Sequence, residues 1–181
     1  MSMKTWVLLL RGINVGGRNV LPMKELAAGL ASLKMLNVRT YIQSGNVVFQ
    51  FKEKLPKSLN KRIADSIEER HGFRPGTFIL SSEALEETIA ANPFPKATGD
   101  PKSLHCFFLA ERVKTMPRDQ LNELASATEK WRLINQTFYL HAPDGVGRSK
   151  LAARVEKTLG APTTARNWKT VLKLSDMVRA T

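Results

Sequence analysis

The sequence predicts an α+β fold built from two copies of one ferredoxin-like unit, β-α-β-β-α-β, each with an antiparallel sheet and followed by an extra helix. Three observations predict it. Apolar runs of strand length alternate with amphipathic runs of helical spacing. A proline-rich stretch, residues 92–101, separates two such series. The order of elements then recurs after roughly 90 residues, although the letters barely match. We therefore expect subdomains at 1–91 and 102–181, joined by a linker at 92–101.

Local patterns define the elements of the first half. Residues 4–10 form a continuous apolar run that is typical of a buried strand. Pro22 suits the first position of a helix over 22–35, where leucines recur at helical spacing. Right-handed crossovers then place both main helices on one face of the sheet. The remaining expected elements are strands at 38–43, 47–51 and 77–80, a helix from Pro56 to His71-Gly72, and a helix from Ser82 to about residue 91.

The second half repeats this order. Residues 104–109 read as an apolar strand, and Pro117 opens a helix. Residues 131–134 and 137–141 flank Asn135-Gln136 as a hairpin. The last expected elements are a helix capped by Ser149 and closed by Gly160, a short strand at Thr163-Thr164, and a final helix at about 167–179.

The composition is ordinary except for its charge. Of 181 residues, 43% are hydrophobic and 24% charged, as in globular proteins. The net charge of +12 and the pI near 10.1 favour phosphate-bearing partners such as nucleic acid, nucleotides or anionic lipid. The alternative is that the charge only keeps the protein in solution.

Several features that the sequence lacks lead to expectations about its cofactors and its cellular compartment. Cys106 is the only cysteine, which suits a reducing cytoplasmic interior. No run resembles a signal peptide or a membrane span, so we expect no membrane association. The three histidines are scattered without ligand spacing, and we expect no metal and no cofactor.

Three segments together resemble one family. They are residues 9–17 (LLRGINVGG), 41–49 (YIQSGNVVF) and 166–174 (RNWKTVLKL). The chain is similar over essentially its whole length to the bacterial domain-of-unknown-function family DUF1697. The resemblance implies a duplicated ferredoxin-like fold and brings no established activity, cofactor or catalytic residue.

The first segment opens a loop, residues 11–22, that is rich in glycine, arginine and asparagine and has no carboxylate. Its glycines would let the backbone approach a ligand, and the following helix would direct free N–H groups toward an anion. The loop matches neither the dinucleotide fingerprint nor a P-loop, and a tight strand-to-helix connection is the equal alternative. Its candidate binding residues are Arg11, Gly12, Asn14, Gly16, Gly17 and Arg18.

The second segment holds a tight turn, in which Ser44 and Asn46 are candidate ligand contacts. A hairpin turn with side-chain hydrogen bonds is the favoured interpretation, and Ser44 lacks the surroundings of a nucleophile. We expect this turn at the opposite end of the sheet from the exit of the first strand. The two segments would then not share a pocket unless the other half of the chain supplied a surface between them.

The third segment begins the last helix. Asn167 suits the N-cap and Trp168 a contact with the core; alternatively, Trp168 stacks on a ligand and Arg166 contacts a phosphate. Residues 148–181 carry eight Lys or Arg against two acids. A basic helix face is expected at Lys150, Arg154, Lys157, Lys169 and Lys173.

These features favour a non-enzymatic binding module for a phosphate-bearing partner, with nucleic acid ahead of nucleotide. The motifs offer Arg, Asn, Gln, Ser and Gly, which recognise and orient ligands and rarely transfer protons. One alternative is a small-molecule enzyme or sensor with a site between the halves, made by Arg11, Asn14, Arg166 and Trp168. Another is a protein-interaction module, which predicts an exposed apolar patch. The sequence leaves the oligomeric state open.

Overall fold

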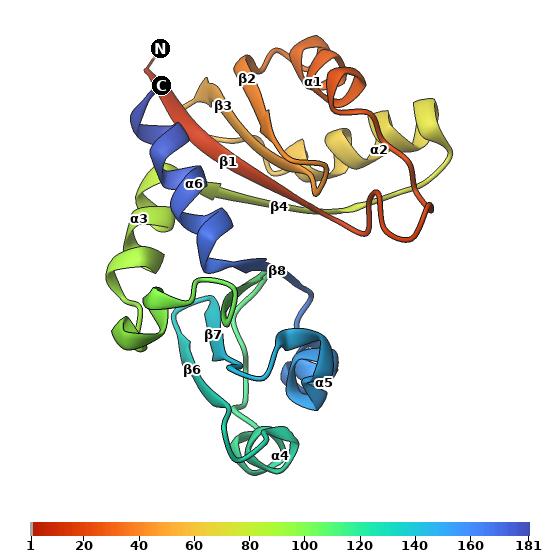
Figure 1. Ribbon diagram of the computed structural model, residues 1–181. Coiled ribbons are helices and arrows are strands. Elements are labelled where there is room, and N and C mark those ends of the chain that lie inside the picture. Colours follow the sequence, from red (N-terminus) through yellow and green to blue (C-terminus); the bar gives the residue numbers. More distant parts are fainter. Residues whose placement is uncertain (1) are drawn as a thin grey trace. The chain divides into compact units, whose positions relative to one another are not determined.

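The computed structural model describes residues 2–181 and contains two four-stranded antiparallel sheets with six α-helices among these residues (Figure 1). The chain forms two compact units. The first contains residues up to Glu86 together with Lys173–Thr181, and the second is Glu87–Leu172. Within residues 2–181, no helix combines the length and the apolar character needed to cross a membrane.

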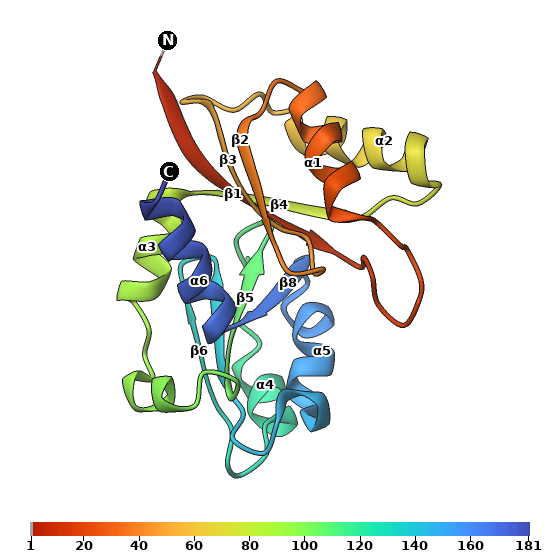
Figure 2. The ribbon, with the colours of Figure 1, turned by 45° about the horizontal axis from the view of Figure 1, so that its top comes forward.

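The first unit has the β-α-β-β-α-β order that the sequence predicted. Its strands lie in the order β2-β3-β1-β4, and all neighbours are antiparallel. Helices α1 and α2 cover one face of this sheet (Figures 1 and 2). The elements are β1 (Met3–Arg11), α1 (Met23–Ser32), β2 (Leu36–Tyr41), β3 (Asn46–Lys52), α2 (Leu59–His71) and β4 (Gly76–Ser81).

Both faces of the first sheet are buried. Alternation along β1 directs Leu8 and Leu10 into a cluster with the apolar side chains of α1 and α2. Val7 and Leu9 point to the other face and are also fully buried, as is Val48 of β3. None of these three residues is aromatic, so they offer no stacking surface of the kind by which some ferredoxin-like domains bind RNA.

The second unit repeats the topology of the first. Its strand order, β6-β7-β5-β8, corresponds element by element to β2-β3-β1-β4. Leu151, Val155 and Leu159 of α5 join the core, where Phe107 and Phe138 meet edge to face with their ring centroids 5.9 Å apart. The elements are η1 (Pro95–Gly99, a 3-10 helix), β5 (Leu104–Leu109), α4 (Arg118–Leu124), β6 (Lys130–Ile134), β7 (Thr137–His141), η2 (Val146–Arg148, also 3-10), α5 (Lys150–Leu159) and β8 (Thr163–Asn167).

An extra helix follows each sheet and confirms the predicted fold class: α3 (Ser82–Ala90) after β4 and α6 (Trp168–Arg179) after β8. Each helix runs from one unit into the other. Within the first unit, Glu86 of α3 accepts hydrogen bonds from Ser175 and from Arg179, the latter at 2.8 Å.

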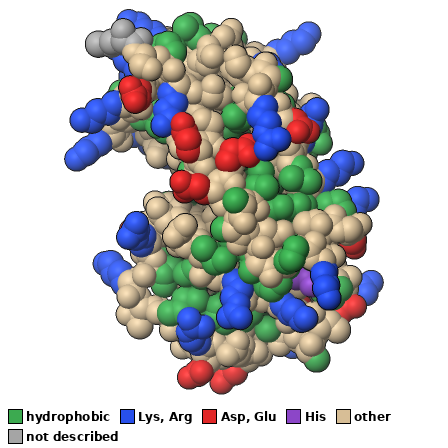
Figure 3. Space-filling view, turned by 90° about the vertical axis from the view of Figure 1, so that its left-hand side faces the viewer, with side chains coloured by type: hydrophobic (Ala, Val, Ile, Leu, Met, Phe, Trp, Pro, Cys, Tyr) green, Lys and Arg blue, Asp and Glu red, His purple; other side chains and the backbone are tan. Residues whose placement is uncertain are grey.

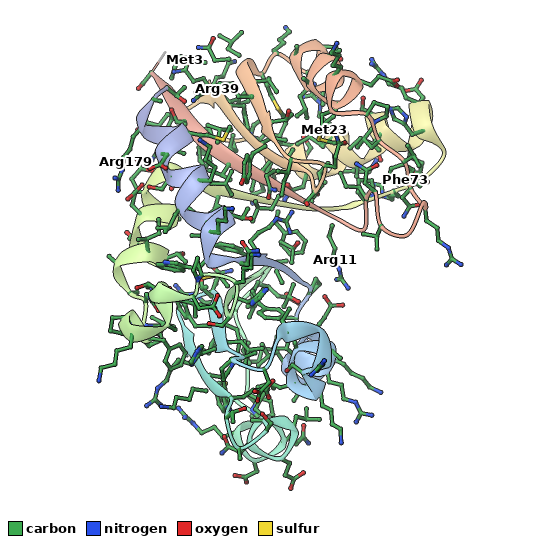
Figure 4. The ribbon with its side chains drawn as sticks, viewed as in Figure 1. Met3, Arg11, Met23, Arg39, Phe73 and Arg179 are labelled. Carbon is green, nitrogen blue, oxygen red and sulfur yellow. The ribbon has the colours of Figure 1, made fainter. Side chains whose placement is uncertain are left out.

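The same unit holds the end of α6 through Arg39 of β2, which donates to the Met177 carbonyl and to the Thr181 hydroxyl (Figure 4). The units consequently divide the chain at other positions than the expected 1–91, 92–101 and 102–181. The tail 173–181 belongs with the first sheet, and residues 92–101, which include η1, belong with the second.

Candidate functional site

The glycine loop between β1 and α1 forms a hairpin that is held by hydrogen bonds among its own residues. At its tip, Gly16 and Gly17 have φ values of 56° and 72°, and the Arg18 N–H donates to the Val15 carbonyl at 3.0 Å. Two successive positive φ values at the centre of such a turn are the requirement of a type I′ turn, which glycine meets without strain. Asn19 closes the base of the hairpin, because its side-chain amide donates to the Gly12 carbonyl at 2.7 Å. The positive φ values thus explain why Gly16 and Gly17 are glycines, before any ligand is considered.

Asn14 fastens this loop to the rest of the first unit. Its amide nitrogen donates to the Leu21 carbonyl at 3.0 Å and to the Gln43 carbonyl at 2.8 Å. Its amide oxygen accepts from the Leu21 N–H at 2.8 Å. The residue itself has φ 52°, a conformation that asparagine tolerates better than most residues. Asn14 therefore orients the loop, and its amide is engaged with backbone groups.

The second predicted turn lies beside the loop, so the expectation that it lies at the opposite end of the sheet is wrong. Strands β1 and β3 are antiparallel with Leu9 opposite Asn46, which brings the start of β3 to the end of β1. The Leu10 N–H donates to the Gly45 carbonyl at 2.8 Å. The two segments therefore meet within one unit, without any contribution from the other half of the chain.

Within this turn, Asn46 is fully buried and donates to the Tyr41 carbonyl at 3.2 Å, which is a structural role. Ser44 is exposed. Ile42 has φ 50° and is 50% exposed, an unusual conformation for a β-branched residue. The accessible surface here thus comes from Ser44 and Ile42 together with the loop tip.

The tip of the glycine loop carries an exposed cation. Arg18 is exposed, and its guanidinium has no ion pair or hydrogen bond to any described residue. No carboxylate occurs in residues 11–22. The loop leads into α1, whose N-cap Pro22 offers no side-chain hydrogen bond, so the first-turn N–H groups are not capped by it. Arg11 is also exposed and extends from the end of β1 (Figure 4).

The third segment is mainly structural. Asn167 caps α6, accepting from the Thr170 N–H at 2.9 Å, as the sequence predicted. Trp168 is only 3% exposed and therefore offers no open stacking face. Arg166 is 9% exposed and donates to the Thr164 hydroxyl at 2.9 Å and to the Ala165 carbonyl at 2.8 Å. Burial lowers the pKa of Arg166 to about 10, so its guanidinium stays charged at neutral pH.

A second cationic surface lies on α5 in the second unit. Lys150, Arg154 and Lys157 of this helix are exposed, while Leu151 and Val155 face the core. The sequence predicted these three cations in one basic face with Lys169 and Lys173, which are also exposed but belong to α6. It did not single out Arg148 of η2, which is also exposed and lies two residues before the helix. Its place in a short 3-10 turn carries no periodic signal.

The sequence also gave no signal for a shallow hollow of about 320 Å³ between the end of α4 and the start of α5. Its charged lining has both signs, and the acidic members come from three separate segments of the second unit. The lining includes Glu123, Glu129, Asp144, Arg148, Ser149 and Lys150.

Burial shifts the pKa values of two interior groups toward their neutral forms. Burial raises the pKa of the Cys106 thiol far above neutral, which keeps it protonated and unreactive. Burial also lowers the pKa of His105, which favours a neutral ring. Among residues 2–181, no group of three or more His, Cys, Asp or Glu side chains is arranged to hold a metal ion.

The basic residues do not merge into one surface on the face shown in Figure 3. There, Lys and Arg side chains are scattered among apolar and neutral ones. On α5, by contrast, Lys150, Arg154 and Lys157 lie on the same face of one helix.

Comparisons with known proteins identify a family. The family described as "Protein of unknown function (DUF1697)" matches residues 3–139. A solved structure, that of the conserved bacterial protein SP0830 from Streptococcus pneumoniae, is similar with a TM-score of 0.70 and 25% sequence identity. The similarity covers 98% of this chain and 99% of that one. Comparison with curated proteins gives no match.

Proposed function

The chain belongs to the DUF1697 family, described only as proteins of unknown function, and we propose that it is a non-enzymatic binding module for a phosphate-bearing partner. One observation carries the proposal: the carboxylate-free loop of the first unit presents Arg18, whose guanidinium has no partner among the described residues, beside two exposed glycines.

The chemistry of the loop fits an oxyanion. A planar guanidinium donates two parallel hydrogen bonds to phosphate, and such charge-assisted bonds are stronger than neutral ones. Glycines at a turn let a ligand oxygen approach backbone N–H groups closely. Asn14 holds the loop in place through three hydrogen bonds, so less ordering is required when a ligand binds.

A binding role is favoured over catalysis because the accessible residues here are Arg, Gly, Asn, Ser, Ile and Val, and none of them is a typical general acid or base. The one cysteine is buried and protonated. A protein-interaction role has one supporting observation, since Val15 and Val20 of the same loop are 68% and 61% exposed. The charge of the loop favours the phosphate partner.

The test is calorimetric titration with pyrophosphate and with a nucleoside diphosphate at low salt, comparing wild type with Arg18→Ala. Loss of a charge-assisted hydrogen bond should weaken binding by about tenfold or more. Arg62→Ala is the matched control, because Arg62 is an exposed arginine of α2 in the same unit with no ion pair to a described residue. It should bind like wild type.

Two results would contradict the proposal. Wild type that binds neither ligand would exclude a phosphate site of useful affinity. Equal weakening by Arg18→Ala and Arg62→Ala would show that only net charge matters, and that the loop is no site.

A further inference from the structure

We propose that the exposed face of α5 binds the sugar-phosphate backbone of a nucleic acid, which makes the partner a polynucleotide and not a mononucleotide. This inference rests on the proposed function, because it names the class of phosphate-bearing partner. It is carried by a second cationic surface, located in the second unit and separate in sequence from the glycine loop.

The cations of α5 share one side of the helix. Lys150, Arg154 and Lys157 stand at positions i, i+4 and i+7, which fall on the same face of an α-helix. With a rise of 1.5 Å per residue they extend over about 10 Å. This length is comparable to the Debye length at 0.1 M salt, about 10 Å, so the three charges act jointly on a polyanion. Arg148 precedes them by two residues.

The cations on the exposed face of α5 are not neutralised by acidic side chains of the described residues. Lys150, Arg154 and Lys157 form no ion pair with any described residue. The only acid of α5 is Glu156, whose carboxylate accepts from the Thr163 N–H at 2.7 Å and so is directed toward β8. The opposite face of α5 is buried in the core, which fixes the helix in place. The cations are therefore held in position without neutralisation.

A polyanion fits this arrangement better than a single nucleotide. Three cations along about 10 Å of helix meet successive phosphates, whereas one mononucleotide carries its charge at one end. The second unit as a whole has thirteen Lys or Arg and eight Asp or Glu, so its field also attracts polyanions. The acids Glu123, Glu129 and Asp144 line the hollow near Lys150. We therefore expect Arg154 and Lys157, outside that lining, to contribute more than Lys150.

The experiment is fluorescence anisotropy with labelled single-stranded RNA, single-stranded DNA and duplex DNA, titrated at several salt concentrations. The test protein carries Lys150→Gln, Arg154→Gln and Lys157→Gln. The control protein carries Lys96→Gln, Lys102→Gln and Arg132→Gln. Those three residues are also two lysines and one arginine of the second unit, exposed and without ion pairs to described residues. Both variants lose the same charge, and circular dichroism checks that both fold.

We expect wild type and control to bind an oligonucleotide with similar affinity and salt dependence. The test variant should bind at least tenfold more weakly, and its slope of log K against log salt should fall by about 2 to 3. The test variant should retain binding of pyrophosphate, which reports on the glycine loop alone.

Several outcomes would overturn the inference. If wild type binds pyrophosphate but no oligonucleotide, the inference fails while the proposed function stands. If neither binds, both fail. Equal losses of affinity in the test and control variants would show that binding depends on net charge alone. Equally tight binding of polyglutamate or anionic vesicles would show that the α5 face does not select nucleic acid.

Discussion

Ile42 is a β-branched residue in the left-handed region, with φ 50°. This conformation costs an L-residue roughly 1–2 kcal/mol, and asparagine tolerates it better. Because the side chain is half exposed, little apolar burial is lost on substitution. We expect Ile42→Asn to raise the free energy of unfolding by up to about 1 kcal/mol, measured by urea denaturation. Ile42→Val keeps the branched Cβ and should give no gain; a gain with valine would contradict the strain argument.

Gly45 combines a positive φ with a close approach to other atoms. A Cβ at this position would lie 2.5 Å from the Leu10 Cβ and 2.8 Å from the Ile13 Cδ1, and φ is 73°. Gly45→Ala should therefore destabilise the protein by about 2–4 kcal/mol, through backbone strain and overpacking together. Gly16 has φ 56° but nothing within 4 Å, so Gly16→Ala should cost only about 1 kcal/mol. Equal losses in thermal unfolding would refute the packing contribution.

Helix α5 depends on its first residues for local stability. The Ser149 hydroxyl accepts from the Ala152 N–H at 2.9 Å and satisfies one of the N–H groups that a helix leaves unpaired. Ser149→Ala should lower the free energy of unfolding by about 1 kcal/mol. Ser149→Thr keeps a hydroxyl acceptor at the helix N-terminus without adding charge, so chemical denaturation should show most of the loss recovered. A loss as large with threonine would rule out capping as the cause.

The elements were predictable because short-range rules define them. Ser149 and Gly160 bound α5 as expected, and the expected strand at 104–109 is β5. The meeting of the two N-terminal segments was not predictable in the same way. It depends on the antiparallel register that places Leu9 opposite Asn46, which is a long-range fact.

The candidate binding residues differ in their burial, and the sequence alone does not show which of them are exposed. Arg166 and Trp168 stand in as polar and basic a sequence context as Arg18, yet they are buried and Arg18 is exposed. The composition predicts the net charge of the molecule but not where the charged side chains lie on its surface. The structure shows an exposed arginine in the glycine loop and three exposed cations on one face of α5, whereas some other cations are paired, as Arg74 is with Asp65 at 2.6 Å.

The stability of the first unit should fall in acid. The guanidinium of Arg179 and the hydroxyl of Ser175 lower the pKa of Glu86 below its usual 4.5. The Glu83 pKa is lowered to about 2, first by hydrogen bonding to its own backbone and to Ser81. A carboxyl whose folded pKa is depressed stabilises the protein above its unfolded pKa, and this stabilisation disappears as pH falls through the folded value. The loss should therefore occur between about pH 4.5 and pH 2.

Glu86→Gln tests this dependence directly, because it removes the titrating group that joins α3 to the end of α6. We expect the variant to be slightly less stable than wild type at pH 7, since the ion pair is partly exposed and screened. The difference should shrink toward pH 2, measured as unfolding midpoints in urea. Glu87→Gln changes an exposed neighbour that has no ion pair to a described residue, and its pH profile should follow wild type. A wild-type profile for Glu86→Gln would mean that this contact does not stabilise the packing of residues 173–181 within the first unit.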